Sequence, residues 1–470
     1  MMSMLPTLGE AYYVLEWIIR LAMLAVVPFR RNPAATTSWL LLIFFLPLPG
    51  LLLFLAIGAP RFPRWRTARF RQLQPFFERV AIRLEQAAPP APDTPADIST
   101  LAERLGYLPA TGGNAIELLE EYQTVVDRLI ADIDRARSHV RILAYIFADD
   151  ETGRNVIAAL QRATQRGVAC HVLFDPVGSR KWSKRVQRRL EEAGVAVRAA
   201  LPFRLLRART RRDMRNHRKL FLIDGEIGYA GSQNLVSRDF RPGVVNRELV
   251  GRVEGPAVAA MNAVFLGDWY LETEDLLEPD PAIPESAASS TLQILPSGAD
   301  YRLESFQALL TWQVGEARRE VVIVTPYLIP DESLLTALRT AVLRGVDVRI
   351  IVSSVIDQWL VRLAQDSYYD ELLRSGVRIH TYRDELLHAK NVRIDGRLGI
   401  LGSSNVDIRS FQLNEEVSLL LLDPASIARL EEIQRRYLSH SDEITRAQWR
   451  QRSRLRKLAE NGARLVSPLL

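Results

Sequence analysis

The chain has 470 residues, 25% of them charged and 48% hydrophobic, with a formal net charge of +6. This length allows two or three domains with cores of their own, and the composition excludes an intrinsically disordered chain. The basic balance favours anionic partners such as phosphate, nucleic acid or an acidic membrane surface, without choosing among them. The one cysteine, Cys170, excludes an intrachain disulfide and a cysteine-based zinc site, and its apolar neighbours indicate a core residue.

Residues 1–60 are predicted to form a membrane hairpin. Trp39–Ala59 is an uncharged apolar run long enough to cross a bilayer as a helix, which its internal Pro-Leu-Pro-Gly sequence would kink. The earlier apolar segment, Tyr12–Phe29, contains Glu16 and Arg20, so it is either a poorer span or an interfacial helix. A hairpin buried in a soluble protein is the less favoured alternative, because the second run is long and uniform. A cleavable signal peptide is not expected, because the basic start is missing.

Residues 61–112 are predicted to be a basic juxtamembrane segment followed by a Pro-rich linker at Gln86–Asp97. The arginines that follow the second apolar run are Arg61, Arg64, Arg66, Arg69 and Arg71. By the positive-inside rule, they place the remainder of the chain in the cytoplasm, and they also suit anionic lipid headgroups. Arg30 and Arg31 point weakly the other way, which leaves the topology of the first segment open.

Beyond the linker, helix-period and strand-period segments alternate, which predicts an α/β fold with mostly parallel sheets flanked by helices. The pattern occurs twice, over residues 113–285 and 286–470. An Arg-Gly-Val sequence recurs at corresponding places, and Tyr145 and Tyr327 stand at equivalent strand ends. Two such halves predict a pseudo-twofold dimer within one chain, with a ligand in the cleft between them.

Each half contains one copy of a His-x-Lys motif with the same residue types around it. The first copy reads NHRKLFLIDGEIGYAGSQN from residue 216, and the second reads LHAKNVRIDGRLGILGSSN from residue 387. The shared positions are His217, Lys219, Asp224, Ser232 and Asn234 in the first half, and His388, Lys390, Asp395, Ser403 and Asn405 in the second. A single copy is usually surface decoration, but recurrence at equivalent places of a duplicated fold makes chance a poor explanation.

The motif residues have the chemistry of an anion-binding site. A histidine and a lysine two residues apart on a strand project to the same side. Histidine can act as nucleophile, acid or base near neutral pH, lysine suits phosphate oxygens, and the Gly-Ser-x-Asn turn supplies N–H, hydroxyl and amide groups. Two copies around one anion suit a phosphodiester, with one histidine attacking phosphorus and the other protonating the leaving alcohol. This chemistry requires no metal or cofactor, and the sequence has no phosphate-binding loop or metal-ligand cluster.

Two further carboxylates follow the motifs at similar distances. Glu248 and Glu416 each stand two residues after an asparagine and before a strand, where a buried carboxylate could hold the second nitrogen of each histidine. Asp224 and Asp395 are assigned to the catalytic set, although forming the turn after the strand explains them equally well. The remaining histidines lack such partners and are interpreted as structural or solvated: His139, His171, His380 and His440.

The paired motifs resemble the signature of the phospholipase D superfamily, which is two copies of His-x-Lys-x4-Asp. Over nearly the whole chain, the sequence is also similar to bacterial cardiolipin synthases with an N-terminal membrane hairpin, through segments such as AYIFADDETG, TPYLIPDESLLTAL and DIRSFQLNEEV. The resemblance implies an inner-membrane, multi-pass enzyme that transfers a phosphatidyl group between two phosphatidylglycerol molecules, giving cardiolipin and glycerol. It also implies that His217 and His388 are the nucleophile and the acid/base, in that order, with Lys219, Lys390, Asn234 and Asn405 around the phosphate.

Several rival functions share these residues. With water as the acceptor, the same site would be a phospholipase D that makes phosphatidic acid, and another donor such as phosphatidylethanolamine would give a different phosphatidyltransferase. A nuclease fits the basic composition, but the membrane hairpin argues against it, so no nucleic-acid partner is expected. Intact histidines and lysines in both halves disfavour a non-enzymatic lipid-binding scaffold. The arginine-rich loop before His217 could gather anionic lipid, and the oligomeric state is not indicated.

Overall fold

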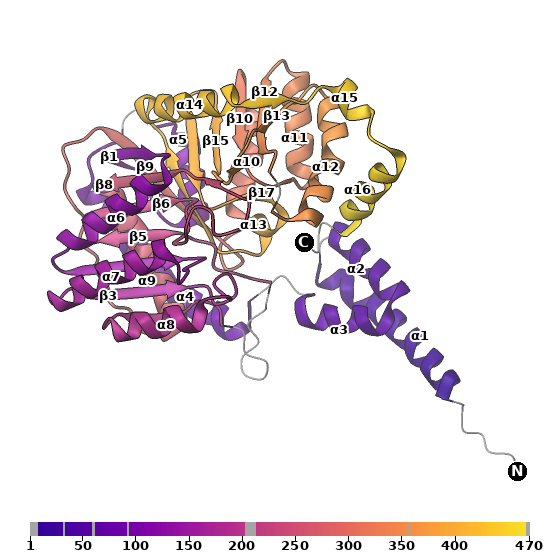
Figure 1. Cartoon of the computed structure of the whole chain (residues 1–470), viewed down its shortest axis with the longest axis horizontal. Coiled ribbons are helices and arrows are strands. Elements are labelled where there is room, and N and C mark those ends of the chain that lie inside the picture. The colour runs from indigo at the N-terminus through magenta and orange to yellow at the C-terminus, as the bar shows by residue number, and fades with distance from the viewer. Residues whose placement is uncertain are drawn as a thin grey trace, which may run out of the picture.

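The computed structural model describes residues 8–31, 33–58, 62–91, 94–202, 213–355 and 357–466. In Figure 1 a group of N-terminal helices lies beside a larger α/β body that contains both halves of the duplication. The arginine-rich loop that precedes His217 lies mostly outside the described residues, and so do the last four residues of the chain.

One sheet of 15 strands runs through both halves, in the order β19-β13-β12-β10-β15-β16-β18-β9-β1-β8-β6-β5-β2-β3-β4. The first half contributes β1 (Thr111–Leu119), β2 (His139–Ala144), β3 (Ala169–Phe174), β4 (Ala196–Ala199), β5 (Leu220–Ile223), β6 (Ile227–Gly231) and β8 (Val250–Glu254). The second half contributes β9 (Ser290–Ser297), β10 (Glu320–Val324), β12 (Asp347–Ser353), β13 (Arg378–Tyr382), β15 (Asn391–Ile394), β16 (Leu398–Gly402), β18 (Glu416–Leu421) and β19 (Ser441–Glu443). The halves join where β1 pairs with β9, and the strands follow in equivalent order on either side, which confirms the duplication.

The sheet is mixed, not mostly parallel as the sequence predicts. Within this 15-stranded sheet, parallel pairing is confined to β2, β3 and β4 in the first half and to β10, β12 and β13 in the second. The strands nearer the centre are antiparallel, because short turns at Asp224-Gly225 and Asp395-Gly396 return the chain directly into β6 and β16. Periodicity identified the strands, but these short turns determine their direction.

Helices cover both faces of the sheet. On one face, α9 (Ala257–Thr273) and α14 (Pro424–Ser439) share a hydrophobic core with central strands of both halves. On the other, α6 (Tyr122–Arg135), α7 (Glu151–Gln165) and α8 (Ser183–Glu192) pack in a second core, and α10 (Ser305–Glu316), α11 (Glu332–Leu343) and α12 (Trp359–Arg374) in a third. α7 and α11 begin alike, because Asp150 and Asp331 each accept backbone N–H bonds of their first turn.

Two helices within residues 61–112 hold the halves together around the Pro-rich run. α4 (Arg64–Ala87) packs along α9, and α5 (Ala96–Gly106) packs against β9 and α10 of the second half. Arg66 is buried with its Nη1 2.6 Å from the Glu272 carboxylate, and Arg69 donates to the Leu271 carbonyl at 3.0 Å. These two arginines therefore bind the protein body, instead of the lipid headgroups that the sequence suggested.

The N-terminal helices differ from the predicted hairpin. Gly9–Phe29, which overlaps α1 (Leu8–Val26), is the one helix in the described residues long and apolar enough to cross a bilayer. The Trp39–Ala59 run is not one spanning helix, because the chain breaks at Leu46 (φ −132°, ψ 73°) before Pro47, which cannot continue the helical hydrogen bonding.

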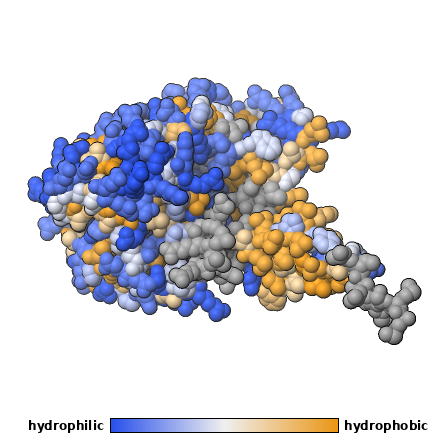
Figure 2. Space-filling model, turned by 60° about the horizontal axis from the view of Figure 1, so that its bottom comes forward, coloured by the Kyte–Doolittle hydropathy of each residue, from blue (hydrophilic) through white to orange (hydrophobic). Residues whose placement is uncertain are grey.

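The break produces a reversal of the chain. α2 (Pro33–Phe45) and α3 (Pro47–Ile57) fold back on each other, with the rings of Trp39 and Phe54 5.2 Å apart. On a straight helix these two positions would be about 22 Å apart. Figure 2 shows apolar side chains gathered over the N-terminal helices, in contrast to the largely hydrophilic α/β body.

Candidate active site

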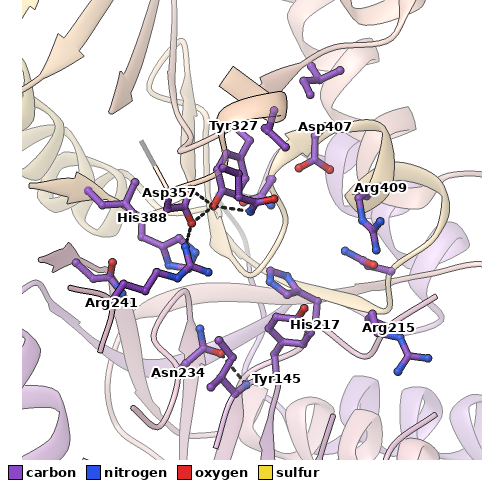
Figure 3. A pocket seen from close by; sticks show the side chains of 18 of the residues that line it. Tyr145, Arg215, His217, Asn234, Arg241, Tyr327, Asp357, His388, Asp407 and Arg409 are labelled. Carbon is purple, nitrogen blue, oxygen red and sulfur yellow. Dashed lines mark hydrogen bonds and ion pairs between the residues drawn. The ribbon is translucent and has the colours of Figure 1, made fainter. Parts of the chain in front are cut away.

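The two His-x-Lys motifs meet in a cavity of about 470 Å³ between the halves (Figure 3). Its lining is nearly symmetric, since equivalent residues of the two repeats face each other across it. These pairs are His217 with His388, Asn234 with Asn405, Tyr145 with Tyr327, and Asn246 with Asn414. The predicted cleft between the halves is therefore present, and the structure brings both histidines and both motif asparagines into it.

Each histidine is held by a carboxylate of the other half. His217 Nδ1 lies 2.9 Å and 3.0 Å from the two carboxylate oxygens of Glu416, and His388 Nδ1 lies 2.7 Å from Glu248 Oε1. Because Nδ1 donates to a carboxylate, Nε2 of each ring is the nitrogen left for a ligand. The sequence suggested a carboxylate for each histidine, but not that the partners are exchanged between repeats.

Backbone pairing across the halves produces this exchange. β14 (Leu386–Leu387), which leads into His388, pairs in parallel with β7 (Asn246–Arg247), which leads into Glu248. The His388 N–H donates to the carbonyl of Arg247 at 2.8 Å, and the His217 N–H donates to the carbonyl of Glu415, also at 2.8 Å. Each half therefore positions the carboxylate beside the other half's histidine through main-chain hydrogen bonds.

Both glutamates are buried and remain ionised. Burial raises the pKa of Glu416, but His217, Lys219 and Ser403 outweigh it, so the net pKa lies below the ordinary value. The Ser403 hydroxyl donates to Glu416 Oε2 at 2.5 Å. Glu248 follows the same balance, with His388, Lys390 and Ser232 lowering its pKa. The two motif serines thus lie beside the carboxylates and support the histidines indirectly.

The histidines themselves are neutral at neutral pH. Burial lowers the pKa of His217 and of His388 to about 4, although the adjacent glutamates act in the opposite direction and the lysines add to the decrease. A neutral imidazole with a free Nε2 is a nucleophile or a base, and an anion bound beside it would raise its pKa.

The two lysines lie behind the histidines. Lys219 Nζ donates to the backbone carbonyl of its own motif histidine at 2.6 Å, and Lys390 does the same in the second half. Both lysines are buried, and burial lowers the pKa of Lys219 to about 7 and of Lys390 to about 8. They therefore place positive charge close to the pocket without lining it, and an anion in the pocket would stabilise their charged forms.

Asp224 and Asp395 do not line the pocket. Asp224 accepts backbone N–H bonds of 2.8–2.9 Å from residues 137–139, and Asp395 accepts bonds of 2.7–2.9 Å from residues 318–320. Each residue has a positive φ, 55° and 52°, in the turn at the far end of the strand from its histidine. This geometry matches the turn-forming alternative and gives neither carboxylate contact with the pocket.

The pocket also contains residues that sequence reasoning missed. Arg215, Arg241 and Arg409 add positive charge to its lining, and Asp357 and Asp407 add carboxylates. Tyr327 donates to the Asp357 carboxylate at 2.7 Å, and Arg241 of the first half forms an ion pair with the same carboxylate, as Figure 3 shows. The repeat identifies Tyr145 and Tyr327 as equivalent residues. No sequence pattern connects Arg241 with Asp357.

Two histidines with ionised partners, two lysines and two asparagines around one cavity define a site for phosphodiester chemistry. A family model described as "Cardiolipin synthase, PLD-like domain" matches residues 129–269 and 310–438. The chain is 32% identical to cardiolipin synthase A of Pectobacterium carotovorum subsp. carotovorum over 98% of its own length and 99% of that protein's. It is 33% identical to cardiolipin synthase A of Proteus mirabilis with the same coverage.

Among solved structures, a phosphatidylserine synthase from Haemophilus influenzae is similar in fold, with a TM-score of 0.59 and 16% identity over 80% of this chain and 100% of that one. The family match and the full-length similarity to curated relatives determine the assignment. The chain belongs to the cardiolipin synthase family with phospholipase D-like domains, and it is a phosphatidyltransferase.

Proposed function

We propose that the enzyme transfers a phosphatidyl group from one phosphatidylglycerol to the headgroup of a second, giving cardiolipin and glycerol through a phospho-histidine intermediate. The observation that carries the proposal is the exchange of carboxylates, which gives His217 and His388 a free Nε2 each at one pocket. The named relatives support the reaction, and the pocket volume of about 470 Å³ suits polar headgroups.

In the first step, Nε2 of His217 attacks phosphorus, and the bond from phosphorus to the glycerol headgroup oxygen breaks. A protonated His388 gives its Nε2 proton to that oxygen, so glycerol leaves as a neutral alcohol. In the second step, neutral His388 removes the proton from a headgroup hydroxyl of the second phosphatidylglycerol. That oxygen attacks phosphorus, the bond to His217 breaks, and His388 is protonated again.

The remaining side chains stabilise the charges on the phosphate group and on His388 during the reaction. Lys219 and Lys390 offset the charge on the non-bridging phosphate oxygens, and Asn234 and Asn405 stand where their amides can bind those oxygens. Glu248 favours the imidazolium form of His388, as the acid role requires, and the phosphodiester anion raises its pKa further. Because one phosphodiester is exchanged for another, the reaction is nearly isoenergetic and needs no nucleotide.

The membrane placement is part of the same proposal. We place the protein in the bacterial inner membrane, anchored through α1, with the α/β body on the cytoplasmic side. The apolar helices α1 to α3 and the arginines after residue 60 support this arrangement.

The reaction is tested with purified full-length protein in mixed micelles that contain phosphatidylglycerol alone, with products followed by mass spectrometry. Cardiolipin and free glycerol are expected, and both should be absent with His217→Ala and with His388→Ala. His380→Gln is the control, because His380 is a buried histidine outside the pocket and its replacement should leave turnover intact.

Other products would contradict the proposal in specific ways. Phosphatidic acid without cardiolipin would identify water as the acceptor and the enzyme as a phospholipase D. Turnover only after phosphatidylethanolamine is added would identify a different donor.

A further inference from the structure

The C-terminal helix α16 (Arg454–Val466) turns its apolar side away from the protein. Leu455, Leu458 and Leu465 are 80%, 70% and 61% exposed. Their spacing of three and seven residues places them along one side of the helix. A helix on the surface of a water-soluble domain has the opposite arrangement, with its apolar side against the core.

The polar side of α16 is the side that packs on the body. Arg456 Nη2 lies 3.0 Å from the Asp366 carboxylate, and Arg464 Nη2 lies 3.2 Å from Glu371, both on α12. Glu460 is buried and pairs with Arg452 and Arg456. Ion pairs therefore hold the helix in this orientation, and the leucines are left for a partner outside the chain.

The surroundings of α16 indicate what this partner is. The Ser38 hydroxyl of α2 donates to the Leu465 carbonyl at 2.9 Å, and Figure 1 shows α16 descending toward the N-terminal helices. The segment from Arg446 to Val466 contains seven arginines and lysines and one glutamate. Arg450 and Arg454 in this segment are exposed. The row of leucines therefore ends next to the apolar N-terminal helices, and exposed arginines lie near it.

We propose that α16 lies in the interface of an anionic lipid bilayer, with its leucines at the level of the upper acyl chains and its arginines at the phosphates. An amphipathic helix with a basic flank has this preference. A second copy of the chain is the weaker alternative, because the exposed side of a 13-residue helix covers about 200 Å², whereas a stable dimer buries about 800 Å² per partner.

This contact also orients the pocket toward the lipid, a consequence that rests on the proposed function. α12 packs along α16, and its first turn reaches the pocket, where Gln358 and Val361 are lining residues. Trp359 and Leu360 in the same turn are 71% and 38% exposed. With α16 in the interface, these side chains form an apolar rim through which a headgroup can reach the histidines.

The test measures contact with lipid and needs no turnover. The full-length Leu458→Cys protein is labelled with a fluorophore and reconstituted in vesicles of phosphatidylcholine and phosphatidylglycerol with nitroxide-bearing lipids. Cys170 is buried, so the parent chain serves as the labelling blank. The matched position is Glu432→Cys, an exposed residue of α14, and this helix lies away from the N-terminal helices in Figure 1.

We expect lipid-borne nitroxides to quench the label at position 458 several-fold more than the label at 432. Adding Leu455→Glu to the labelled protein should reduce this quenching at least by half, because it places a charge in the apolar face. Asn461→Glu adds the same charge to α16 beside Lys457 and Arg464, which offset it, and should reduce the quenching less than Leu455→Glu does. Equal quenching at 458 and 432 would overturn the proposal. Protection of position 458 from both lipid nitroxides and aqueous iodide would overturn it too, since protein would then cover the leucines.

Discussion

At the scale of single residues, the pocket combines groups whose charge states are set by burial. Burial keeps the two histidines neutral near pH 7 and brings the two lysines close to their titration range. The glutamates stay ionised because each faces a histidine and a lysine. The site thus holds basic groups that an anionic phosphodiester would convert to their charged forms.

The pKa values of Lys219 and Lys390 predict how the activity depends on pH. A lysine is charged below its pKa and neutral above it, so kcat/KM should fall as the pH rises through about 7 to about 8. Because the two lysines interact, the apparent pKa belongs to the pair. In Lys219→Arg the first site stays charged, so the fall should move toward about 8, the pKa of Lys390. Initial rates across pH 6 to 10 measure this, and an unchanged profile in the variant would exclude the lysine as its cause.

At the scale of structural elements, the same Asp-Gly turn closes an equivalent hairpin in each half. Asp224 and Gly225 have φ of 55° and 70°, and Asp395 and Gly396 have φ of 52° and 65°. Asp and Gly tolerate this left-handed conformation, and the carboxylate compensates by accepting N–H groups at the start of a neighbouring strand. The aspartate of the motif therefore connects the strand that follows each histidine to the rest of the sheet.

Asp224→Ala should reduce stability by about 1–3 kcal/mol, because three backbone N–H groups at the start of β2 lose their charged acceptor. Turnover per folded molecule should stay close to that of the parent. Burial raises the pKa of Asp224 and the N–H bonds lower it below 3.8, so its contribution is present above that pH and is lost as the pH falls further.

Thermal unfolding at pH 7 and at pH 3 measures both effects, and the difference between variant and parent should shrink at pH 3. Asp127→Ala, which removes an exposed aspartate of α6, is the matched control and should change little. An Asp224→Ala protein that melts like the parent but is as inactive as His217→Ala would restore a catalytic role for Asp224.

At the scale of the whole molecule, neither half contains a complete site. His217 depends on Glu416 and His388 depends on Glu248, so the functional pairs cross between repeats. The β1–β9 pair and the β7–β14 pair hold the halves in the register that this exchange requires. A displacement of one half relative to the other would therefore misorient both histidines together.

A variant of a histidine and a variant of the glutamate that holds it should therefore show the same kind of kinetic defect. With an activated phosphodiester whose leaving group needs no acid, His388→Ala and Glu248→Gln should retain a burst of product followed by slow turnover. His217→Ala and Glu416→Gln should lose the burst, and Glu416→Gln should lower kcat/KM by about 10²–10⁴-fold, as expected when a histidine loses its orienting carboxylate. Stopped-flow absorbance measures both phases.

The double variant His217→Ala/Glu416→Gln should be no worse than His217→Ala alone, because the two residues act as one unit. The cross-half pairing would be contradicted if Glu248→Gln, and not Glu416→Gln, removed the burst. Additive losses in the double variant would also contradict the pairing, because the two residues would then act independently.

The sequence by itself determined the duplication, the paired motifs and the family, because repeated residue types at fixed spacing are visible without coordinates. It also indicated the carboxylates at Glu248 and Glu416, since each follows an asparagine at a similar distance from its motif. These features are local in the chain, so residue types at fixed spacing are enough to reveal them.

Only the tertiary structure decided which groups meet across long separations. It paired each histidine with the glutamate of the other repeat, 199 residues away for His217 and 140 for His388. It moved the two aspartates out of the site, made the sheet mixed, and folded α2 against α3 at Leu46. The physical reason is the same in each case: turn geometry and strand pairing fix the direction of the chain, and spacing along the sequence does not record it.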